Sequence, residues 1–306
     1  MKTYIFILIF SYFITSNLYA LDLKDLTSQK FKGLASQRID QIKSDKLNQY
    51  VSNLEKSIPD LIPGKGLTEV SIQLRENHKP DYSILAVREL NRTENGNTFL
   101  QFSLFNTERQ QKEIGIFNFG LGKRFLSNDK NLMTGFNSFL DYDTHGNTRG
   151  SIGGEVKNSV LGFNTNYYLA IHDGRDDEKV LDGYDIELTS QVPHLHWANV
   201  FVNHYKWYGV ERNDIEGKKY GSELSLLPSL NLEVVYDDKP KDLDEYYVKF
   251  NFVYPPRQNK PTVLDGISGI KWQEEKDMTD QLLTKVKREN VIVVEMSGAA
   301  TISRLD

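Results

Sequence analysis

The sequence predicts an all-β fold, an antiparallel transmembrane β-barrel of about twelve strands, with a short N-terminal helical leader and a C-terminal helix or linker in or below the lumen. From Gly66 onward, apolar and polar residues alternate with the period of two that separates the faces of a strand. The connections between these runs alternate between short and long, as in bacterial outer-membrane barrels. Only 39% of the residues are hydrophobic, which excludes a bundle of apolar membrane helices.

Residues 1–20 have the pattern of a secretory signal peptide. Met1-Lys2 precedes an apolar run from Tyr4 to Phe13, and small or polar residues follow up to Ala20, after which we expect cleavage. The chain contains no cysteine, which excludes a lipid-modified N-terminal cysteine, disulfides and thiolate metal sites. The net charge is -5 without a block of basic residues, so nucleic acid is not an expected partner.

Residues 21–65 are predicted to form a periplasmic helical leader. Between Leu21 and Ile58, apolar residues recur mostly every three to five positions among polar ones. Pro59 and Pro63-Gly64 end this pattern, because proline cannot continue the helical hydrogen bonds. The leader is too short for a separate domain of ordinary size, so an arm without its own fold is the simplest interpretation.

Residues 66–256 are predicted to form the barrel. The expected strands are Leu67–Glu76, Tyr82–Leu90, Thr98–Asn106, Glu113–Phe125, Leu132–Asp143, Arg149–Lys157, Val160–Ile171, Tyr184–Val192, His196–Tyr208, Lys218–Leu227, Leu230–Tyr236 and Glu245–Tyr254. Aromatic residues near the strand ends are expected to form the two interfacial girdles; they are Tyr82, Phe125, Tyr142, Tyr167, Tyr184, Trp207, Tyr208, Tyr236, Tyr246 and Tyr254. A soluble β-sandwich is the alternative, and it would place these rings in a core.

Connection lengths suggest which end of the barrel faces the periplasm. Short connections are expected at Ser127–Lys130, Asn158-Ser159, Pro193–Leu195 and Pro228-Ser229, and longer polar ones at Asn106–Lys112, Thr144–Thr148, His172–Gly183, Gly209–Gly217 and Asp237–Asp244. Periplasmic turns are the short ones in such barrels. Asn91–Asn97 is longer than this scheme predicts for a periplasmic turn.

The alternation also assigns each strand residue to a face. Residues expected to face a polar lumen are Asn137, Asp141, Glu155, Asn164, Asn166, Glu187, Asn203, Glu223, Lys249 and Asn251. Residues expected to face lipid are Phe136, Leu140, Leu161, Phe163, Leu169, Ile186, Leu188, Val200, Val202, Leu224, Val248, Phe250 and Phe252.

The pattern changes again in residues 257–306. A charged linker follows Pro255-Pro256, and Met278–Arg288 then has apolar residues at helical spacing. Val291–Met296 follows as an extended run. We expect a helix and then a strand, and an ordinary periplasmic helix after the barrel is the alternative.

Two stretches resemble one known family. Asn137-x-Phe139-x-Asp141-Tyr142-Asp143 is followed by Gly146-Asn147 and Gly153-Gly154-Glu155, and Leu283-x-Lys285-Val286-x-Arg288-x-Asn290-x-Ile292-Val293-Val294-Glu295 lies near the end. Both are similar to the translocator barrel of the inverse autotransporters, the intimin/invasin family. The resemblance covers roughly Leu67 to Met296.

That resemblance implies a function and a location. In the family, the linker enters the lumen after the last strand, forms a short helix and runs out through the pore to carry a passenger. The residues implied for this lumen segment are Met278, Leu282, Leu283, Val286, Asn290 and Ile292. Only Ser297–Asp306 follow, too few for an adhesin domain, so we expect a translocator without a passenger region. The expected location is the bacterial outer membrane, with outer-membrane lipid, the barrel-assembly machinery and periplasmic chaperones as partners and no specified host or cell-surface receptor.

Other polar motifs give weaker signals for metal binding or catalysis. His194-x-His196 with His204 has the residue type of a metal site, but no further ligand is fixed by spacing. Asp141-x-Asp143-x-His145-Gly146 opens like a calcium loop, but the residue in place of the final Glu is Ile152.

Two further motifs complete the candidates for a chemical site. His172, Asp173, Asp176 and Asp177 suggest a barrel hydrolase as an enzyme alternative, whereas Gly120-x-Gly122-Lys123 lacks the spacing of a phosphate loop. We therefore predict no catalytic residue, metal or cofactor, and keep a pore for small solutes as the main alternative function.

Overall fold

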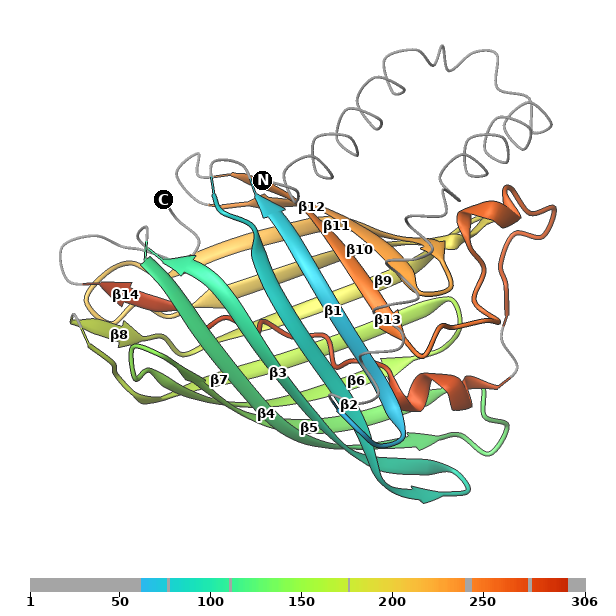
Figure 1. Cartoon of the computed structure of the whole chain (residues 1–306), viewed down its shortest axis with the longest axis horizontal. Coiled ribbons are helices and arrows are strands. Elements are labelled where there is room, and N and C mark those ends of the chain that lie inside the picture. Colours follow the sequence, from blue (N-terminus) through green and yellow to red (C-terminus); the bar gives the residue numbers. More distant parts are fainter. Residues whose placement is uncertain are drawn as a thin grey trace, which may run out of the picture. The chain divides into compact units, whose positions relative to one another are not determined.

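The computed structural model describes residues 62–75, 78–109, 112–175, 177–239, 244–274 and 277–296 (Figure 1). The predicted signal peptide, the leader helix at Leu21–Ile58 and the tail Ser297–Asp306 lie outside the described residues. No helix in the described part of the chain is long and apolar enough to span a membrane.

The strands form one closed antiparallel barrel, which confirms the predicted fold class. Going around the barrel, the order is β1-β13-β12-β11-β10-β9-β7-β6-β5-β4-β3-β2. β1 closes the barrel against β13, with Thr68 opposite Tyr254 and Arg75 opposite Tyr247. The barrel strands are β1 Gly66–Arg75, β2 Asp81–Thr93, β3 Gly96–Arg109, β4 Lys112–Leu126, β5 Met133–Asp143, β6 Thr148–Lys157, β7 Leu161–His172, β9 Gly183–Val192, β10 Leu195–Trp207, β11 Ile215–Leu227, β12 Leu230–Asp238 and β13 Glu245–Tyr254.

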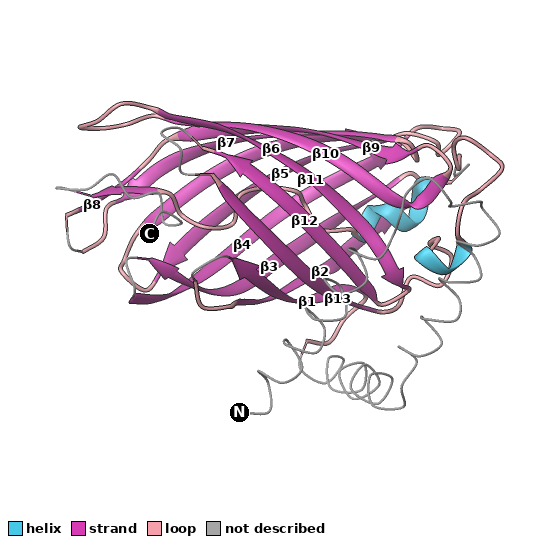
Figure 2. Ribbon diagram, turned by 90° about the horizontal axis from the view of Figure 1, so that it is seen from above, coloured by secondary structure: helices cyan, strands magenta, loops and turns pink. Residues whose placement is uncertain are grey.

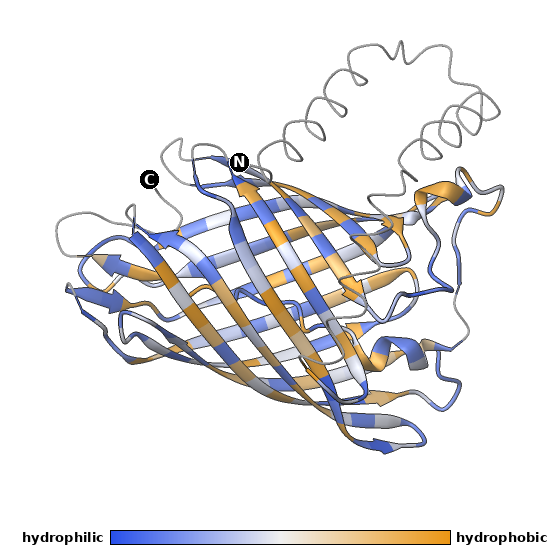
Figure 3. Cartoon of the chain, viewed as in Figure 1, coloured by the Kyte–Doolittle hydropathy of each residue, from blue (hydrophilic) through white to orange (hydrophobic). Residues whose placement is uncertain are grey.

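Alternation of side chains explains why these segments pair as barrel strands. Along β5, every second residue from Met133 to Asp143 is buried, while Phe136 and Leu140 are 68% and 50% exposed on the outer wall. Figure 3 shows the same alternation of hydrophobic and hydrophilic bands along the strands. Outward apolar side chains with inward polar ones are the arrangement of a barrel with a lipid-facing wall and a polar interior.

The strands run further than the sequence indicated at two connections. Asn91–Asn97 was expected to be a long connection, but β2 continues to Thr93 and β3 begins at Gly96, with a register shift between Glu89 and Asn91. Asn106–Lys112 was also expected to be a long loop, but β3 continues to Arg109 and β4 begins at Lys112. In both places polar residues continue the hydrogen-bonded ladder, because strand pairing does not require apolar side chains.

The other elements lie inside the barrel or at its two ends. η1, a 3-10 helix at Val263–Asp265, follows the last barrel strand, and η2, a 3-10 helix, spans Met278–Leu283. β8 (Glu178–Val180) and β14 (Val294–Met296) form a separate two-stranded sheet. Figure 2 shows the two helices at the end of the barrel opposite β8.

We call the two ends the short-turn end and the long-loop end. The short-turn end carries connections 94–95, 127–132, 158–160, 193–194 and 228–229, and the long-loop end carries 76–80, 110–111, 144–147, 173–182, 208–214 and 239–244.

Two predictions about individual elements were wrong. The helix predicted at Met278–Arg288 ends at Leu283 and is a 3-10 helix, because the following residues are extended along the barrel wall. Trp207, expected in an aromatic girdle, is 3% exposed and packs with Tyr168, Leu181 and Tyr205. Its position in β10 has the parity of the inward-facing residues Phe201 and Tyr205, whereas its neighbour Tyr208 is exposed.

Candidate functional site

The candidate site is the barrel interior together with residues 277–296, which we call the lumen segment. Figure 1 shows this segment inside the barrel, running from η2 at one end to β14 at the other. Its buried apolar side chains fall into separate clusters along the wall. Met278 and Leu282 pack against Leu126 and Met133, and further along, Val291 packs against Ile114 and its neighbours.

The first part of the segment is fixed at the short-turn end by η2. The backbone N–H of Met278 donates to the Lys130 carbonyl at 2.8 Å. Asp277 caps η2 by accepting a hydrogen bond from the Thr279 N–H at 2.8 Å. Hydrogen bonding with Thr279 lowers the pKa of the Asp277 carboxyl. η2 is therefore fixed at its start by hydrogen bonds and along its length by the packing of Met278 and Leu282.

Beyond η2, wall side chains donate hydrogen bonds to backbone carbonyls of the segment. Arg124 donates to the carbonyls of Leu282 and Thr284 at 2.9 and 2.6 Å. Arg149 donates to those of Val291 and Glu289 at 3.0 and 2.8 Å. Further donors from this wall are Asn97 to Leu282, Asn166 to Lys287, Asn118 to Asn290 and Arg109 to Ile292.

These donors all belong to β3, β4, β6 and β7. The same wall also accepts from the segment, since Gln101 Oε1 takes the Val286 N–H at 2.8 Å and the Tyr168 hydroxyl takes the Glu289 N–H at 2.7 Å. The extended backbone of the segment is thus hydrogen-bonded along one side of the barrel.

Charged side chains of the segment reach other strands. Lys285 Nζ lies 2.7 Å from Glu69 on β1, and Lys287 Nζ lies 2.9 Å from Glu187 on β9 and 2.8 Å from Glu223 on β11. Glu289 pairs with Lys219 on β11 at 2.9 Å. Alternate residues therefore link the segment to β1, β9 and β11, which lie outside the group of strands that contacts its backbone.

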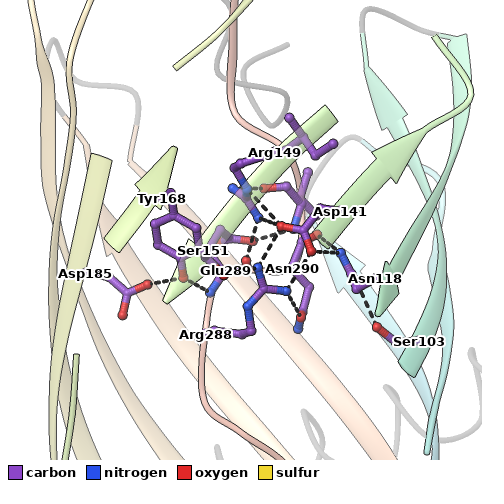
Figure 4. Close-up of polar contacts among 12 residues, drawn as sticks. Ser103, Asn118, Asp141, Arg149, Ser151, Tyr168, Asp185, Arg288, Glu289 and Asn290 are labelled. Carbon is purple, nitrogen blue, oxygen red and sulfur yellow. Dashed lines mark hydrogen bonds and ion pairs between the residues drawn. The ribbon is translucent and has the colours of Figure 1, made fainter. Parts of the chain in front are cut away.

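Arg288 lies at the centre of the most connected polar cluster (Figure 4). Its guanidinium donates to both oxygens of Asp141, at 2.9 and 2.6 Å, and to Ser151 Oγ at 3.1 Å. Asp141 also accepts from Arg149 at 2.8 Å and from Asn118 at 2.8 Å. The side chains of Asp141, Arg149 and Arg288 are each 0% exposed. This cluster joins the segment to three neighbouring strands through charge-assisted hydrogen bonds.

Two inward-facing glycines make room for aromatic rings next to this cluster. A Cβ atom at Gly120 would lie 2.3 Å from the Phe139 ring, and one at Gly122 would lie 2.3 Å from the Phe99 ring. The guanidinium carbon of Arg288 lies 4.2 Å from the Phe139 centroid. Gly120 and Gly122 thus leave the space that the rings of Phe139 and Phe99 occupy.

The long-loop end of the segment is held by β8 and by a buried ionic group. Arg109 lies 3.1 Å from Asp143 and 2.9 Å from Glu178, and it also donates to the Ile292 carbonyl. β14 pairs antiparallel with β8, with Val294 opposite Val180. The Glu295 carboxylate accepts the backbone N–H groups of 210 and 211 in the next loop.

The ten residues predicted to face the lumen have the following surroundings in the structure. Asp141, Asn166, Glu187 and Glu223 contact the segment directly, as described above. Glu155 pairs with Arg124 at 2.6 Å, and Asn251 accepts from Ser71 at 2.7 Å. Asn203 and Lys249 line a cavity of about 160 Å³, and Asn164 lines a second of about 720 Å³ toward η2. Asn137 is 7% exposed and its side chain lies against Gly153.

The six residues assigned to the lumen segment are also distributed along the interior. Met278, Leu282, Val286 and Ile292 are at most 3% exposed. Leu283 packs beside the cluster that contains Val286, and the Asn290 carbonyl accepts from Asn118.

Several residues that were considered for a metal or catalytic site make structural contacts within the chain instead. His194 and His196 lie 3.0 and 2.9 Å from the carbonyls of Ser268 and Ile270, while His204 lies 3.7 Å from Glu216. Among the described residues, no group of three or more histidine, aspartate or glutamate side chains could hold a metal ion. Asp173 accepts from Lys179 and from the Val180 N–H, and Asp176 lies outside the described residues.

Sequence reasoning missed the donors to the segment carbonyls other than Asn166. Arg109, Arg124 and Arg149 lie at inward positions of strands in which polar and apolar residues alternate, and they are 0–2% exposed. Asn97 and Asn118 are buried to the same extent. An arginine at an inward barrel position was the available signal, since such a residue requires acceptors inside the lumen.

Comparison with known proteins agrees with this architecture. The family model of the inverse autotransporter beta-domain matches residues 18–290. A solved structure titled "Unveiling the Mechanism Behind the in-meso Crystallization of Membrane Proteins" is 20% identical, with a TM-score of 0.59, and the match covers 75% of this chain and 98% of that chain. The KdgM porin is 10% identical with a TM-score of 0.42, covering 61% of this chain and 98% of the porin.

Outer membrane phospholipase A from Escherichia coli, as an active-site mutant, is 8% identical with a TM-score of 0.43, covering 66% of this chain and 96% of the phospholipase. A search of curated proteins found no match. The chain belongs to the inverse autotransporter beta-domain family and is a β-barrel of the bacterial outer membrane.

Proposed function

We propose that this barrel holds, and during assembly translocates, a C-terminal segment through its lumen toward the cell surface. In this proposal the short-turn end faces the periplasm and the long-loop end faces outward. The ten lumen residues and the six segment residues predicted from the sequence are proposed to form the passage. The barrel-assembly machinery and periplasmic chaperones are proposed partners, because the barrel must cross the periplasm before it folds.

Recognition of backbone carbonyls supports this proposal best. The contacts from Asn97, Arg109, Asn118, Arg124, Arg149 and Asn166 reach main-chain oxygens, which every residue carries. A wall of such donors can bind the backbone of an extended chain of almost any sequence. Side-chain contacts such as Arg288–Asp141 then fix one register at the end of the process.

A reporter domain fused after Asp306 tests this proposal. The fusion should become accessible to antibody on intact cells. Alanine at both Asn118 and Asn166 should slow its appearance, because two carbonyl donors are lost. Asn164→Ala is the matched control, since it removes an inward amide from the same strand as Asn166. A reporter that never reaches the surface, or equal rates in all variants, would contradict the proposal.

An open pore for small solutes is the second candidate, favoured by the two cavities beside the segment. Deleting residues 277–306 distinguishes the two functions. A segment that occupies the lumen predicts a clear rise in single-channel conductance in planar bilayers. Unchanged conductance would favour the pore.

We propose no catalytic function. Asp173, one of the two described aspartates of the alternative hydrolase site, is engaged by Lys179 and by the backbone of Val180. These contacts support a role in holding β8 beside β14.

A further inference from the structure

Between the last barrel strand and η2 lies an apolar stretch, residues 262–272, which we call the rim segment. Polar residues flank it on both sides, at 257–260 and 273–274. The rim segment itself carries Val263, Leu264, Ile267, Ile270 and Trp272. It was assigned from the sequence to a charged linker, but the rim segment is richer in apolar residues than the stretches on either side.

The rim segment is fixed to the short-turn end by its backbone. Trp197 Nε1–H donates to the Gly266 carbonyl at 2.8 Å, and the rings of His194 and His196 reach the carbonyls of Ser268 and Ile270. The backbone of His194 exchanges hydrogen bonds with Ser268 and Lys271, at 2.8 and 2.9 Å. Much of the polar main chain is thus satisfied by the rim of β9 and β10.

Side chains on the free side of the rim segment are apolar and exposed. Leu264, Ile267 and Ile270 are 44%, 39% and 69% exposed. Asp265, the carboxylate among them, turns back to accept the Thr262 N–H at 2.7 Å. In Figure 3 part of the ribbon at η1, at the end of the barrel, has the hydrophobic colour.

This apolar surface lies beside strands that carry the lipid-facing wall. η1 lies against β10 and β11, and Leu188 on β9 and Val200 on β10 are 50% and 45% exposed on the outer face of the same strands. Short turns of an outer-membrane barrel lie at the membrane surface, so the rim segment is placed at that interface. Lys271 Nζ lies 5.4 Å from the Trp272 ring centroid, a pairing of residue types suited to headgroups.

We propose that the rim segment is a membrane-interface anchor that binds phospholipid, with Leu264, Ile267 and Ile270 inserted at the boundary between headgroups and acyl chains. Apolar side chains of interfacial segments enter this boundary by about 5–10 Å. The anchor holds the linker beside the barrel wall at the point where the chain turns toward η2. The anchor thereby fixes the position at which the lumen segment begins, whatever cargo is attached to that segment.

Fluorescence quenching by lipid tests this proposal in the cysteine-free full-length chain. Leu264→Cys, Ile267→Cys and Ile270→Cys are each labelled with an environment-sensitive dye, and the protein is folded into phosphatidylethanolamine and phosphatidylglycerol vesicles containing doxyl lipid. Gln258→Cys, an exposed position in the polar part of the same linker, is the control. Heat-modified migration on a gel establishes that each variant is folded.

The proposal predicts blue-shifted emission at the three apolar positions and stronger quenching than at Gln258. Shallow doxyl groups should quench more strongly than deep ones, because the segment lies in the interface. Aqueous emission and quenching equal to that of the Gln258 label, in folded protein, would overturn the proposal. That result would mean that lipid does not cover this surface, whether or not the barrel translocates a segment.

Discussion

Removing either partner of the Arg288–Asp141 contact should destabilise the folded protein by unequal amounts. Arg288→Met removes two hydrogen bonds to a carboxylate, but Asp141 keeps Arg149 and Asn118 as donors. The two bonds form one bidentate contact between charged groups, which we count once at about 1.5–3 kcal/mol because Asp141 keeps its other donors, and this is the expected loss in the free energy of unfolding. Asp141→Asn leaves two buried guanidiniums without their carboxylate, so we expect about 3–5 kcal/mol.

A double-mutant cycle isolates the contact from the rest of the cluster. The double variant should lose about 1–3 kcal/mol less than the sum of the single variants, since the two residues share one interaction. The protein is folded into lipid vesicles and unfolded in guanidinium chloride, with tryptophan fluorescence as the signal. Arg212→Met, on the exposed loop 208–214, is the matched control and should change stability by less than about 0.5 kcal/mol. Single variants that behave like Arg212→Met, or strictly additive losses, would refute the view that this contact holds the segment.

Three further predictions concern the wall, the apolar anchor and the cap of η2. Val202 faces outward in the middle of β10, so Val202→Arg should impair assembly at a cost of about 2–4 kcal/mol. Asn203 faces the interior cavity, so Asn203→Arg should still give heat-modifiable protein. Equal tolerance of the two substitutions would contradict the assigned faces. Leu282→Ala should lower the unfolding free energy by about 2–5 kcal/mol in the vesicle assay because Leu282 is fully buried; no loss would mean that its cluster does not hold η2. Because hydrogen bonding with Thr279 lowers the pKa of Asp277, the stabilisation of η2 by this cap is present above the unfolded-state pKa and is lost as the pH falls through the lower folded value. We therefore expect the unaltered chain to open to conductance only in acid and Asp277→Ala to do so at neutral pH; identical pH profiles would exclude this cap.

The barrel could be predicted because its strands obey a simple physical rule. Outward residues contact lipid and inward residues face a polar interior, so apolar and polar residues alternate along each strand. The prediction failed at Asn91–Asn97 and Asn106–Lys112, where polar residues continue the ladder. Ladder hydrogen bonds join backbone groups, so hydropathy alone does not reveal where a strand stops.

The lumen segment shows a different limit. Met278, Leu282, Leu283 and Val286 have helical spacing, yet the residues after Leu283 are extended. Lys285 and Lys287 pair on one side, and Val286 and Arg288 contact the other. A helix would use the carbonyls that Arg124, Arg149 and Asn166 occupy. Those donors come from strands more than a hundred positions earlier, so no local pattern could indicate them.

Labelling with a bulky maleimide, too large to pass outer-membrane pores, tests the central claim that the segment crosses the barrel from the periplasmic to the outer end. Met296→Cys lies beside β8 at the long-loop end, and Gln258→Cys lies in the linker before the segment enters the barrel. The account predicts that intact cells label Met296→Cys, and that Gln258→Cys reacts only after the outer membrane is permeabilised. Labelling of Met296→Cys only after permeabilisation would contradict it.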